Sequence, residues 1–324
     1  MQHCSLQLSV IICTHNPRPD YLRRTLDALK AQTFRKEQWE LLLVDNASKE
    51  PFAAVWDLTW HPHARVIREN ELGLTHARLR GIRESNCDLI VFVDDDNVLE
   101  PNYLEQGISI AKLHPWLGAF NGSTIGEFEH DPHDWVRFVL PNLAIREVKT
   151  VEWACQPGTR ALGCAPCGAG MVIRRHVALA YLNKVKDDPL RISLDRSGRT
   201  LGAAGDSDMA LCSCEMGLAV GLFPELSLKH LIPPSRLESD YLIRLAEGMS
   251  RSHAILRYIW DGELPKTPES VKPCRSERLL RAYQAFRLRL SATLAQQFRA
   301  EIQAASLRGE FQAAEMLAHL ERRE

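Results

Sequence analysis

The most constraining feature of this sequence is a short apolar run that ends abruptly in three acids. Residues 89–93 read Leu-Ile-Val-Phe-Val, and Asp94, Asp95 and Asp96 follow directly. The β-branched and aromatic residues of this run predict a buried strand. In open α/β sheets ligands bind at the carboxyl ends of strands, so the three acids lie where a site is expected. We call Asp94, Asp95 and Asp96 the acid triplet.

Adjacent carboxylates repel one another, so a cation is expected beside the acid triplet. The usual cation is a hard divalent ion, Mg²⁺ or Mn²⁺, which also binds phosphate oxygens. A solvated acidic turn or a helix cap explains the acid triplet equally well when it is considered alone. The rest of the sequence has to decide between these alternatives.

Strand and helix patterns alternate before the acid triplet. Strands are predicted at 8–13, 40–44 and 65–68, and helices at 20–32 and after residue 70 to about 85. This alternation predicts a parallel, Rossmann-like sheet, and right-handed crossovers bring its strand ends to one edge. No G-x-G-x-x-G follows the first strand, and no G-x-x-x-x-G-K-[ST] occurs in the sequence. We therefore expect a metal, rather than a glycine loop, to hold any diphosphate.

The second half of the sequence predicts shorter strands mixed with loops and helices. In chain order, the expected elements are a glycine-rich turn at 164–170 with a strand after it, a hairpin at 192–201 that turns at Ser197-Gly198, a helix from about Ser207, a short strand at 218–223, a helix at 239–260, a linker at 262–273 and a helical tail from Arg275. The glycines permit a ligand to approach the backbone closely, although a simple tight turn explains them too.

Composition limits the classes of protein that this chain can represent. The 324 residues carry a net charge of -1, which gives no reason to expect a nucleic-acid partner. No apolar run approaches the roughly 20 residues that span a bilayer. No secretory signal is recognised, so the 9 cysteines are expected to be reduced thiols in a cytoplasmic protein. Cys164-x-x-Cys167 and Cys212-x-Cys214 lack the second spaced pair that a zinc site requires.

Several ordered motifs together resemble the family 2 glycosyltransferases. They are VIICTHN at 10–16, VDNAS at 44–48, N-x-x-G-x-x-x-A-R at 70–78, FVDDDN at 92–97, GAGM at 168–171 and DRSGRTLGAAGDSDMAL at 195–211. The resemblance covers about residues 6–235. It implies the GT-A fold, an α/β architecture with a Rossmann-like mixed, mainly parallel sheet flanked by helices. We assign residues 1–262 to this catalytic domain, with a nucleotide-sugar half at about 1–118 and an acceptor half at about 119–262. Residues 263–324 form a linker and an amphipathic C-terminal helical extension.

The resemblance implies an inverting, metal-dependent transfer of a sugar from a nucleotide-diphosphate sugar, expected to be a UDP-sugar, to an acceptor hydroxyl. It assigns Asp96 to Mn²⁺ or Mg²⁺, Asp94 to the metal or ribose, and Asp95 to the donor sugar. His230 follows as a further metal ligand, although a lone histidine is as often structural. Asp206 matches the general base of the family. Here Gly205 replaces the usual glutamate before it, so Asp208 remains a rival for that role.

The same resemblance implies a set of residues that bind the nucleotide sugar. They are Thr14, His15, Asn16, Asp45, Asn46, Gly73, Arg78, Asp94, Asp95, Gly168, Ala169 and Gly170. Asp45 is expected to accept a hydrogen bond from a nucleobase N–H. Arg78 is expected near the diphosphate or behind the acids, and a salt bridge to Asp94 that only holds the loop is the simpler alternative.

Two other functions remain open at this point. A nucleotidyltransferase shares a similar sheet and metal site, but the segment after the first strand lacks the glycine-rich loop that it usually has. A non-catalytic sugar-binding protein on a glycosyltransferase fold is disfavoured because Asp94, Asp96, Asp206 and His230 occur together. The acceptor is expected to be a saccharide or a lipid-linked molecule, in polysaccharide or glycoconjugate synthesis.

The C-terminal tail carries one apolar stripe, which requires a partner surface. The stripe comprises Leu279, Tyr283, Phe286, Leu290, Leu294, Phe298 and Ile302. Its first part is basic, with Arg275, Arg278, Arg281, Arg287 and Arg289. Such a helix can lie on the anionic inner face of a membrane. We favour packing on the catalytic domain, or on a second copy in a homodimer, because amphipathic helices usually face a core.

Overall fold

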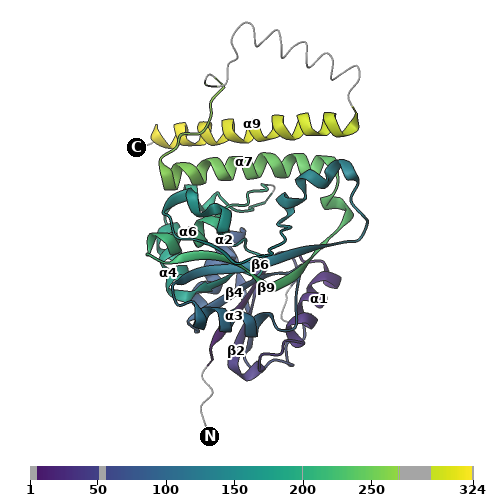
Figure 1. Ribbon diagram of the computed structural model, residues 1–324, viewed down its shortest axis with the longest axis vertical. Coiled ribbons are helices and arrows are strands. Elements are labelled where there is room, and N and C mark those ends of the chain that lie inside the picture. Colours follow the sequence, from purple (N-terminus) through teal and green to yellow (C-terminus); the bar gives the residue numbers. More distant parts are fainter. Residues whose placement is uncertain (1–5, 51–55, 199, 269, 271–292, 323–324) are drawn as a thin grey trace.

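The computed structural model describes residues 6–50, 56–198, 200–268, 270 and 293–322. It contains one mixed, mainly parallel sheet with helices on both faces (Figure 1). Within the described ranges, no helix is long and apolar enough to cross a membrane. The mixed, mainly parallel sheet flanked by helices agrees with the predicted architecture.

The strands run in the order β3-β2-β1-β4-β8-β6-β9-β5 across the sheet, and β7 pairs with β9. The first four strands along the chain are β1 (Leu8–Thr14), β2 (Trp39–Asn46), β3 (Ala64–Glu69) and β4 (Leu89–Asp94), and all of them are parallel. The others are β5 (Asn97–Leu99), β6 (Leu117–Phe128), β7 (Glu152–Ala154), β8 (Val172–Arg174) and β9 (Ala219–Ile232). Strand β8 is antiparallel to both of its neighbours, β4 and β6, while β6 and β9 are parallel.

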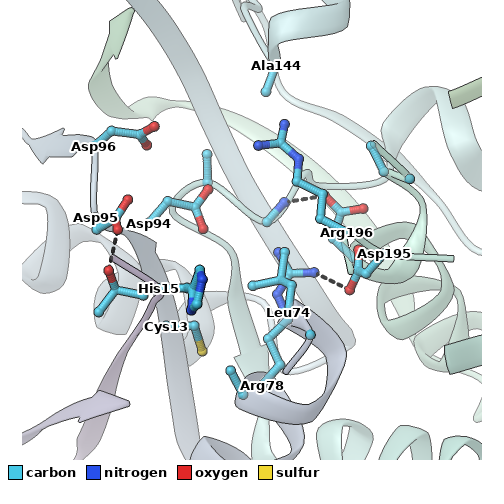
Figure 2. A pocket seen from close by; sticks show the side chains of 18 of the residues that line it. Cys13, His15, Leu74, Arg78, Asp94, Asp95, Asp96, Ala144, Asp195 and Arg196 are labelled. Carbon is cyan, nitrogen blue, oxygen red and sulfur yellow. Dashed lines mark hydrogen bonds and ion pairs between the residues drawn. The ribbon is translucent and has the colours of Figure 1, made fainter. Parts of the chain in front are cut away.

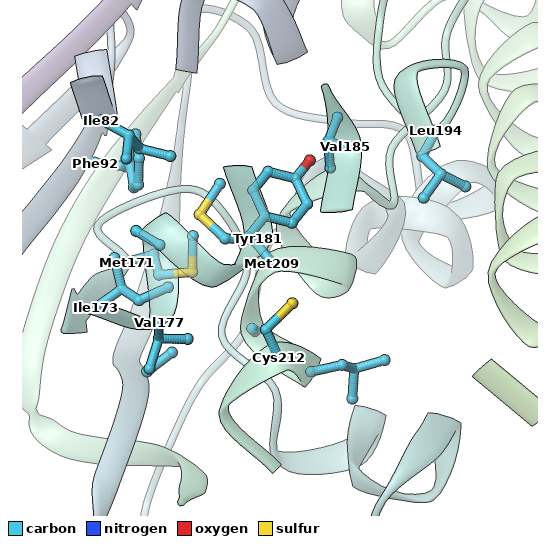
Figure 3. Close-up of a cluster of buried hydrophobic side chains, with 14 of the residues drawn as sticks. Ile82, Phe92, Met171, Ile173, Val177, Tyr181, Val185, Leu194, Met209 and Cys212 are labelled. Carbon is cyan, nitrogen blue, oxygen red and sulfur yellow. The ribbon is translucent and has the colours of Figure 1, made fainter. Parts of the chain in front are cut away.

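Two apolar clusters hold helices against the two faces of the sheet. Alternate residues of a strand point to opposite faces, and β1 follows this rule. Val10 and Ile12 pack in one cluster with α1 (Pro19–Lys30) and α3 (Tyr103–Leu113). Ile11 packs in the other cluster, part of which Figure 3 shows. Its helices are α2 (Leu74–Glu84), α4 (Arg175–Val185) and α6 (Gly205–Glu215).

The remaining helical elements are short turns and two long helices. The short ones are η1 (Lys36–Gln38), η3 (Asp134–Leu143), η4 (Gly158–Cys164), α5 (Pro189–Ile192) and η5 (Pro234–Arg236). The long ones are α7 (Ser239–Asp261) and α9 (Leu294–Glu321), which lie side by side at one end of the molecule (Figure 1).

The helix α9 packs on the catalytic domain, as favoured for the tail. Phe298 is buried between the rings of Trp135 and Phe138 from η3, at centroid distances of 4.8 and 5.8 Å. Ile302 is buried in the same cluster, whereas Leu294 is exposed. The stripe residues 279–290 and the five arginines of 275–289 lie outside the described residues. Membrane contact and pairing of two copies therefore stay predictions.

Two predicted elements of the second half differ in the structure, and one long strand was not predicted. Residues 117–128 form one long strand, and 219–232 form a single strand instead of a short one ending at 223. Pro224 is tolerated because the β6–β9 register shifts beside it, where no ladder N–H is needed. The predicted hairpin at 192–201 reduces to an isolated bridge between Ser197 and Thr200. Its Asp195 side chain instead accepts the N–H of Gly205, which ties the segment to α6 rather than to a strand.

Candidate active site

A cavity of about 350 Å³ opens where β1 and β4 end (Figure 2). Its walls come from the ends of β1, β2 and β4, the start of α2, the glycine-rich turn before β8 and the start of α6. Residues 142–144, at the end of η3, and residues 195–198 complete it. The parallel strands bring these segments together because their carboxyl ends meet at one edge of the sheet.

The acid triplet faces this cavity, as predicted from its place after a buried strand. Burial and the charge of Asp96 raise the pKa of Asp95 to about 7, and the Thr14 hydroxyl donates to its carboxylate. Burial and the same neighbour also raise the pKa of Asp94. Burial alone would raise the pKa of Asp96, but the protonated form of His230 and the guanidinium of Arg236 hold it below its ordinary value. The negative charge is therefore concentrated on Asp96, the acid with cationic support.

His230 lies on β9 beside Asp96, with its Nε2 3.4 Å from Asp96 Oδ2. Its Nδ1 is 2.9 Å from the carbonyl oxygen of Leu143. A carbonyl oxygen can only accept a hydrogen bond, so Nδ1 must be the donor. Nδ1 therefore carries a proton in either charge state of the ring, and in the neutral ring Nε2 presents a lone pair. The guanidinium of Arg236 donates to that lone pair at 3.0 Å. This is the tautomer that a metal-binding histidine requires.

The donor types around Asp96 fit a hard divalent ion. Carboxylate oxygens and an imidazole nitrogen suit Mn²⁺, and carboxylates suit Mg²⁺. In the part of the chain that the structure describes, no three His, Cys, Asp or Glu side chains converge as a ready-made metal cluster. Asp96 and His230 are the pair that does come together, and Arg236 lies against both.

Asp206 lies in the first turn of α6 and faces the cavity. Its Oδ2 accepts the backbone N–H of Gly168 at 2.6 Å. A Cβ atom at Gly168 would overlap the guanidinium of the buried Arg78, so a larger residue there would displace Arg78. Gly170 adopts a φ of 71°, which favours glycine, and its carbonyl accepts the Tyr103 hydroxyl at 2.7 Å. The glycine-rich turn thus positions Asp206 at the edge of the cavity.

Asp208, the rival candidate for the base, does not line the cavity. Its side chain is fully buried, forms an ion pair with Arg191 and accepts the indole N–H of Trp260 at 2.7 Å. Burial raises the pKa of Asp208 to about 6 even though Arg191 opposes the shift. A base has to reach the acceptor hydroxyl, so this placement favours Asp206 over Asp208, and the choice of base stays a prediction.

Arg78 is buried against Asp195, with 3.0 Å between Nη1 and Oδ2. Asp195 also accepts the Thr75 hydroxyl at 3.1 Å and the N–H of Gly205 at 3.2 Å. The partner is therefore Asp195 and not Asp94, the alternative considered for a loop-holding salt bridge. Arg78 serves as a support that joins α2 to the segment before α6.

Residues 9–161 match the model of "Glycosyl transferase family 2". This part, a little under half of the chain, is similar to the family 2 glycosyltransferases, and we call it the family 2 domain. The matched part contains the acid triplet and Arg78, and it ends before Gly168, Asp206 and His230. The match agrees with the family that the ordered motifs predicted.

Similar proteins support the same family. A "Glucosyl-dolichyl phosphate glucuronosyltransferase" of Haloferax volcanii is 25% identical over 126 residues, which is 38% of this chain and 40% of that protein. The "Amylovoran biosynthesis glycosyltransferase AmsE" of Erwinia amylovora is 28% identical over 144 residues, 43% of this chain and 53% of that protein. The chain thus spans about two fifths to one half of these two relatives.

A solved structure shows the same fold. The crystal structure of residues 1–349 of S. aureus TarS aligns with a TM-score of 0.50 at 14% identity. The alignment covers 97% of this chain and 92% of that one. At this identity the likeness concerns the GT-A fold alone, and it includes the region beyond the family 2 domain.

The family 2 domain brings most of the predicted donor-binding residues to the cavity. They are Thr14, His15, Asn46, Gly73, Arg78, Asp94 and Asp95, with Gly168 and Ala169 beyond the matched part. Asn46 accepts the N–H of Gly73 at 2.8 Å, and Gly73 directly precedes α2 with a φ of 148°. Asn46 thereby fixes the loop that leads into α2.

Asn16, Asp45 and Gly170 do not line the cavity. Asp45 is buried, pairs with Arg68 and accepts the N–H of Ser48 at 3.1 Å. Its contact with a nucleobase stays a prediction.

Asp195, Arg196 and Arg236 line the cavity but were not among the predicted site residues. Asp195 and Arg196 open the motif at 195–211, so the pattern contained them. Arg236 follows two prolines directly after β9, and only its position in the fold brings it to the acid triplet.

Proposed function

We propose that this chain transfers a sugar from a nucleotide-diphosphate sugar, specifically a UDP-sugar, to an acceptor hydroxyl with inversion at the anomeric carbon. The observation that carries the proposal is that the acid triplet and Asp206 face one cavity from different elements. Such a site has one set of carboxylates for the charged leaving group and a separate carboxylate for the acceptor. The cavity size lies within the range of small-molecule sites.

Asp206 would act as the general base. An acceptor hydroxyl has a pKa far above neutrality, so its proton has to be removed as the oxygen attacks. The N–H of Gly168 orients the Asp206 carboxylate and leaves further lone pairs for the hydroxyl. A single base without a covalent intermediate implies one displacement, and therefore inversion.

Asp96, His230 and Asp94 would hold Mn²⁺ or Mg²⁺. When bound, such an ion supplies Lewis-acid stabilisation of the departing nucleoside diphosphate. The residues around it have their own tasks. Leu143 fixes the tautomer of His230, and Thr14 holds Asp95 through a hydrogen bond. The buried Arg78–Asp195 pair keeps α2 and α6 in register around the cavity.

The names of the two relatives support glycan synthesis as the setting. One name specifies a glucosyl-dolichyl phosphate substrate, and the other specifies amylovoran biosynthesis. A saccharide or a lipid-linked acceptor is therefore proposed here. The assay described next identifies the donor sugar.

The test offers purified protein UDP-, GDP- and dTDP-sugars with Mn²⁺ or Mg²⁺ and follows release of the nucleoside diphosphate. We expect release from a UDP-sugar and its loss in EDTA. Release of pyrophosphate from a nucleoside triphosphate and a sugar phosphate would instead identify a nucleotidyltransferase. Binding of a sugar with no turnover of any donor would identify a non-catalytic protein, and full turnover in EDTA would reject the metal.

A further inference from the structure

Arg236 lies in the short turn between β9 and α7. Pro233 and Pro234 precede it, and the N–H of Arg236 donates to the Pro233 carbonyl at 3.0 Å. The prolines restrict the backbone of this turn, so the guanidinium is delivered to the cavity from a fixed point. The Arg236 side chain retains 23% of its exposure and lines the cavity.

One nitrogen of Arg236 lies between the side chains of Asp96 and His230 and contacts both. Its Nη1 is 3.0 Å from Asp96 Oδ2 and 3.0 Å from His230 Nε2. Those two acceptor atoms are themselves 3.4 Å apart. In the neutral form of His230, the lone pairs of Nε2 and of the carboxylate face each other and repel. The Arg236 guanidinium relieves this by donating a hydrogen bond to Nε2 and forming an ion pair with Asp96.

The same two atoms are the ones that a divalent ion would use. An imidazole Nε2 has a single lone pair, which cannot serve an arginine N–H and a metal at once. Two positive charges would also lie within a few ångströms of each other. Arg236 and the ion therefore compete for Asp96 and His230.

Resting on the proposed function, we propose that Arg236 is a displaceable counter-ion. Arg236 holds Asp96 and His230 until the metal and the donor arrive together, and then its guanidinium leaves them for the donor diphosphate. Arginine matches phosphate oxygens with two parallel N–H bonds, so the diphosphate is a suitable new partner in the same cavity. This couples the two ligands, because each makes the movement of Arg236 less costly for the other.

The test measures Mn²⁺ binding to the full chain by the electron paramagnetic resonance signal of free Mn²⁺, with and without UDP. Arg236→Gln is compared with the wild type and with Arg244→Gln, which removes an exposed arginine of α7 outside the cavity. Without UDP, we expect Arg236→Gln to bind Mn²⁺ about tenfold more tightly, which is within the usual range of coupling. With UDP, the sign reverses and the variant binds Mn²⁺ more weakly, since the contact with the diphosphate is lost. Arg244→Gln should behave as the wild type.

An unchanged Mn²⁺ affinity of Arg236→Gln without UDP would overturn the inference. A gain of the same size with and without UDP would also overturn it, because that result indicates a through-space charge effect without movement. Asp96→Ala separates this failure from failure of the proposed function. If Asp96→Ala binds Mn²⁺ as well as the wild type, the metal site itself is wrong and the inference falls with it.

Arg236→Lys extends the test if Arg236→Gln does not fold. Lysine keeps the charge but is one bond shorter, so it bridges Asp96 and His230 less well. Tighter Mn²⁺ binding without UDP supports competition through the bridge. Wild-type affinity under both conditions overturns it.

Discussion

Asp206 and Asp208 show how two acids on one helix acquire different roles. In the structure Asp206 faces the cavity, and Asp208 is buried with Arg191 and Trp260. Residues two positions apart on an α-helix differ by about 200° in direction. This angular difference predicts that only one of the two acids can face the cavity, and it could have been used on the sequence alone.

Asp206→Asn should lower turnover by roughly 10²- to 10⁴-fold, with donor affinity nearly unchanged, because only proton removal is lost. The asparagine oxygen can still accept the N–H of Gly168. Steady-state kinetics and donor titration measure the two effects separately. Asp240→Asn is the matched control, since Asp240 also lies in the first turn of a helix but outside the cavity. An active Asp206→Asn with an inactive Asp208→Asn would contradict the assignment.

Asp96→Ala should abolish transfer while the protein keeps its fold. Asp96 is the acid of the triplet that pairs with Arg236. It lies after the end of β4, so its replacement removes no strand pairing. Circular dichroism and thermal unfolding check the fold, and donor release checks the activity. Wild-type turnover of this variant would remove Asp96 from the metal site.

The raised pKa of Asp208 makes stability depend on pH. Between about pH 4 and pH 6 the native state keeps a proton that the unfolded chain has released. The free energy of unfolding attributable to this group therefore falls as pH rises through that window, by up to roughly 3 kcal/mol. Denaturant titrations at several pH values measure it. In Asp208→Asn this part of the slope should disappear, and an unchanged slope would contradict the prediction.

At the scale of elements, α9 supports the site through η3. Phe298 packs on Trp135 and Phe138 of η3, and the last residue of η3, Leu143, accepts the Nδ1–H of His230. The support therefore extends from the C-terminal helix to a candidate metal ligand. Phe298→Ala should destabilise the protein by about 3–5 kcal/mol, because it removes a buried ring from this cluster.

Thermal unfolding measures the loss in Phe298→Ala, and Mn²⁺ binding at a temperature where the variant is folded reports on His230. We expect weaker Mn²⁺ binding in addition to the lower stability. Exposed Leu294→Ala is the control from the same helix and should change neither property. Normal stability of Phe298→Ala would show that α9 does not support η3.

Deletion of residues 275–324 should expose the apolar surface of α7 and η3 that α9 covers. Reduced solubility, or a change of oligomeric state measured by light scattering, is the expected result. Liposome flotation tests the membrane alternative on the full chain. Binding to anionic liposomes at low salt that is lost on deletion, with a stable and soluble core left behind, would favour the membrane.

At the scale of the whole molecule, local patterns were sufficient for the first half and insufficient for the second. The strand at 89–93 and its acids follow from periodicity and composition, and they stand where expected. The pair Arg78–Asp195 joins residues 117 positions apart, and no spacing rule connects them. The bridge from Arg236 to Asp96 and His230 depends on β9 running unbroken through Pro224, which the sequence pattern did not predict.

The position of β8 bears on the order in which this molecule assembles. Residues 172–174 lie between β4 and β6, so a strand from late in the chain occupies the middle of a sheet begun much earlier. The nascent chain up to residue 118 therefore has β4 as an unpaired edge until some fifty further residues have been synthesised. Contacts between such distant segments close slowly, because loop entropy is lost before they form. The cavity is complete only after residues up to 236 have been synthesised, and a ribosome-bound intermediate with β1 to β4 formed would expose the edge of β4 until β8 arrives.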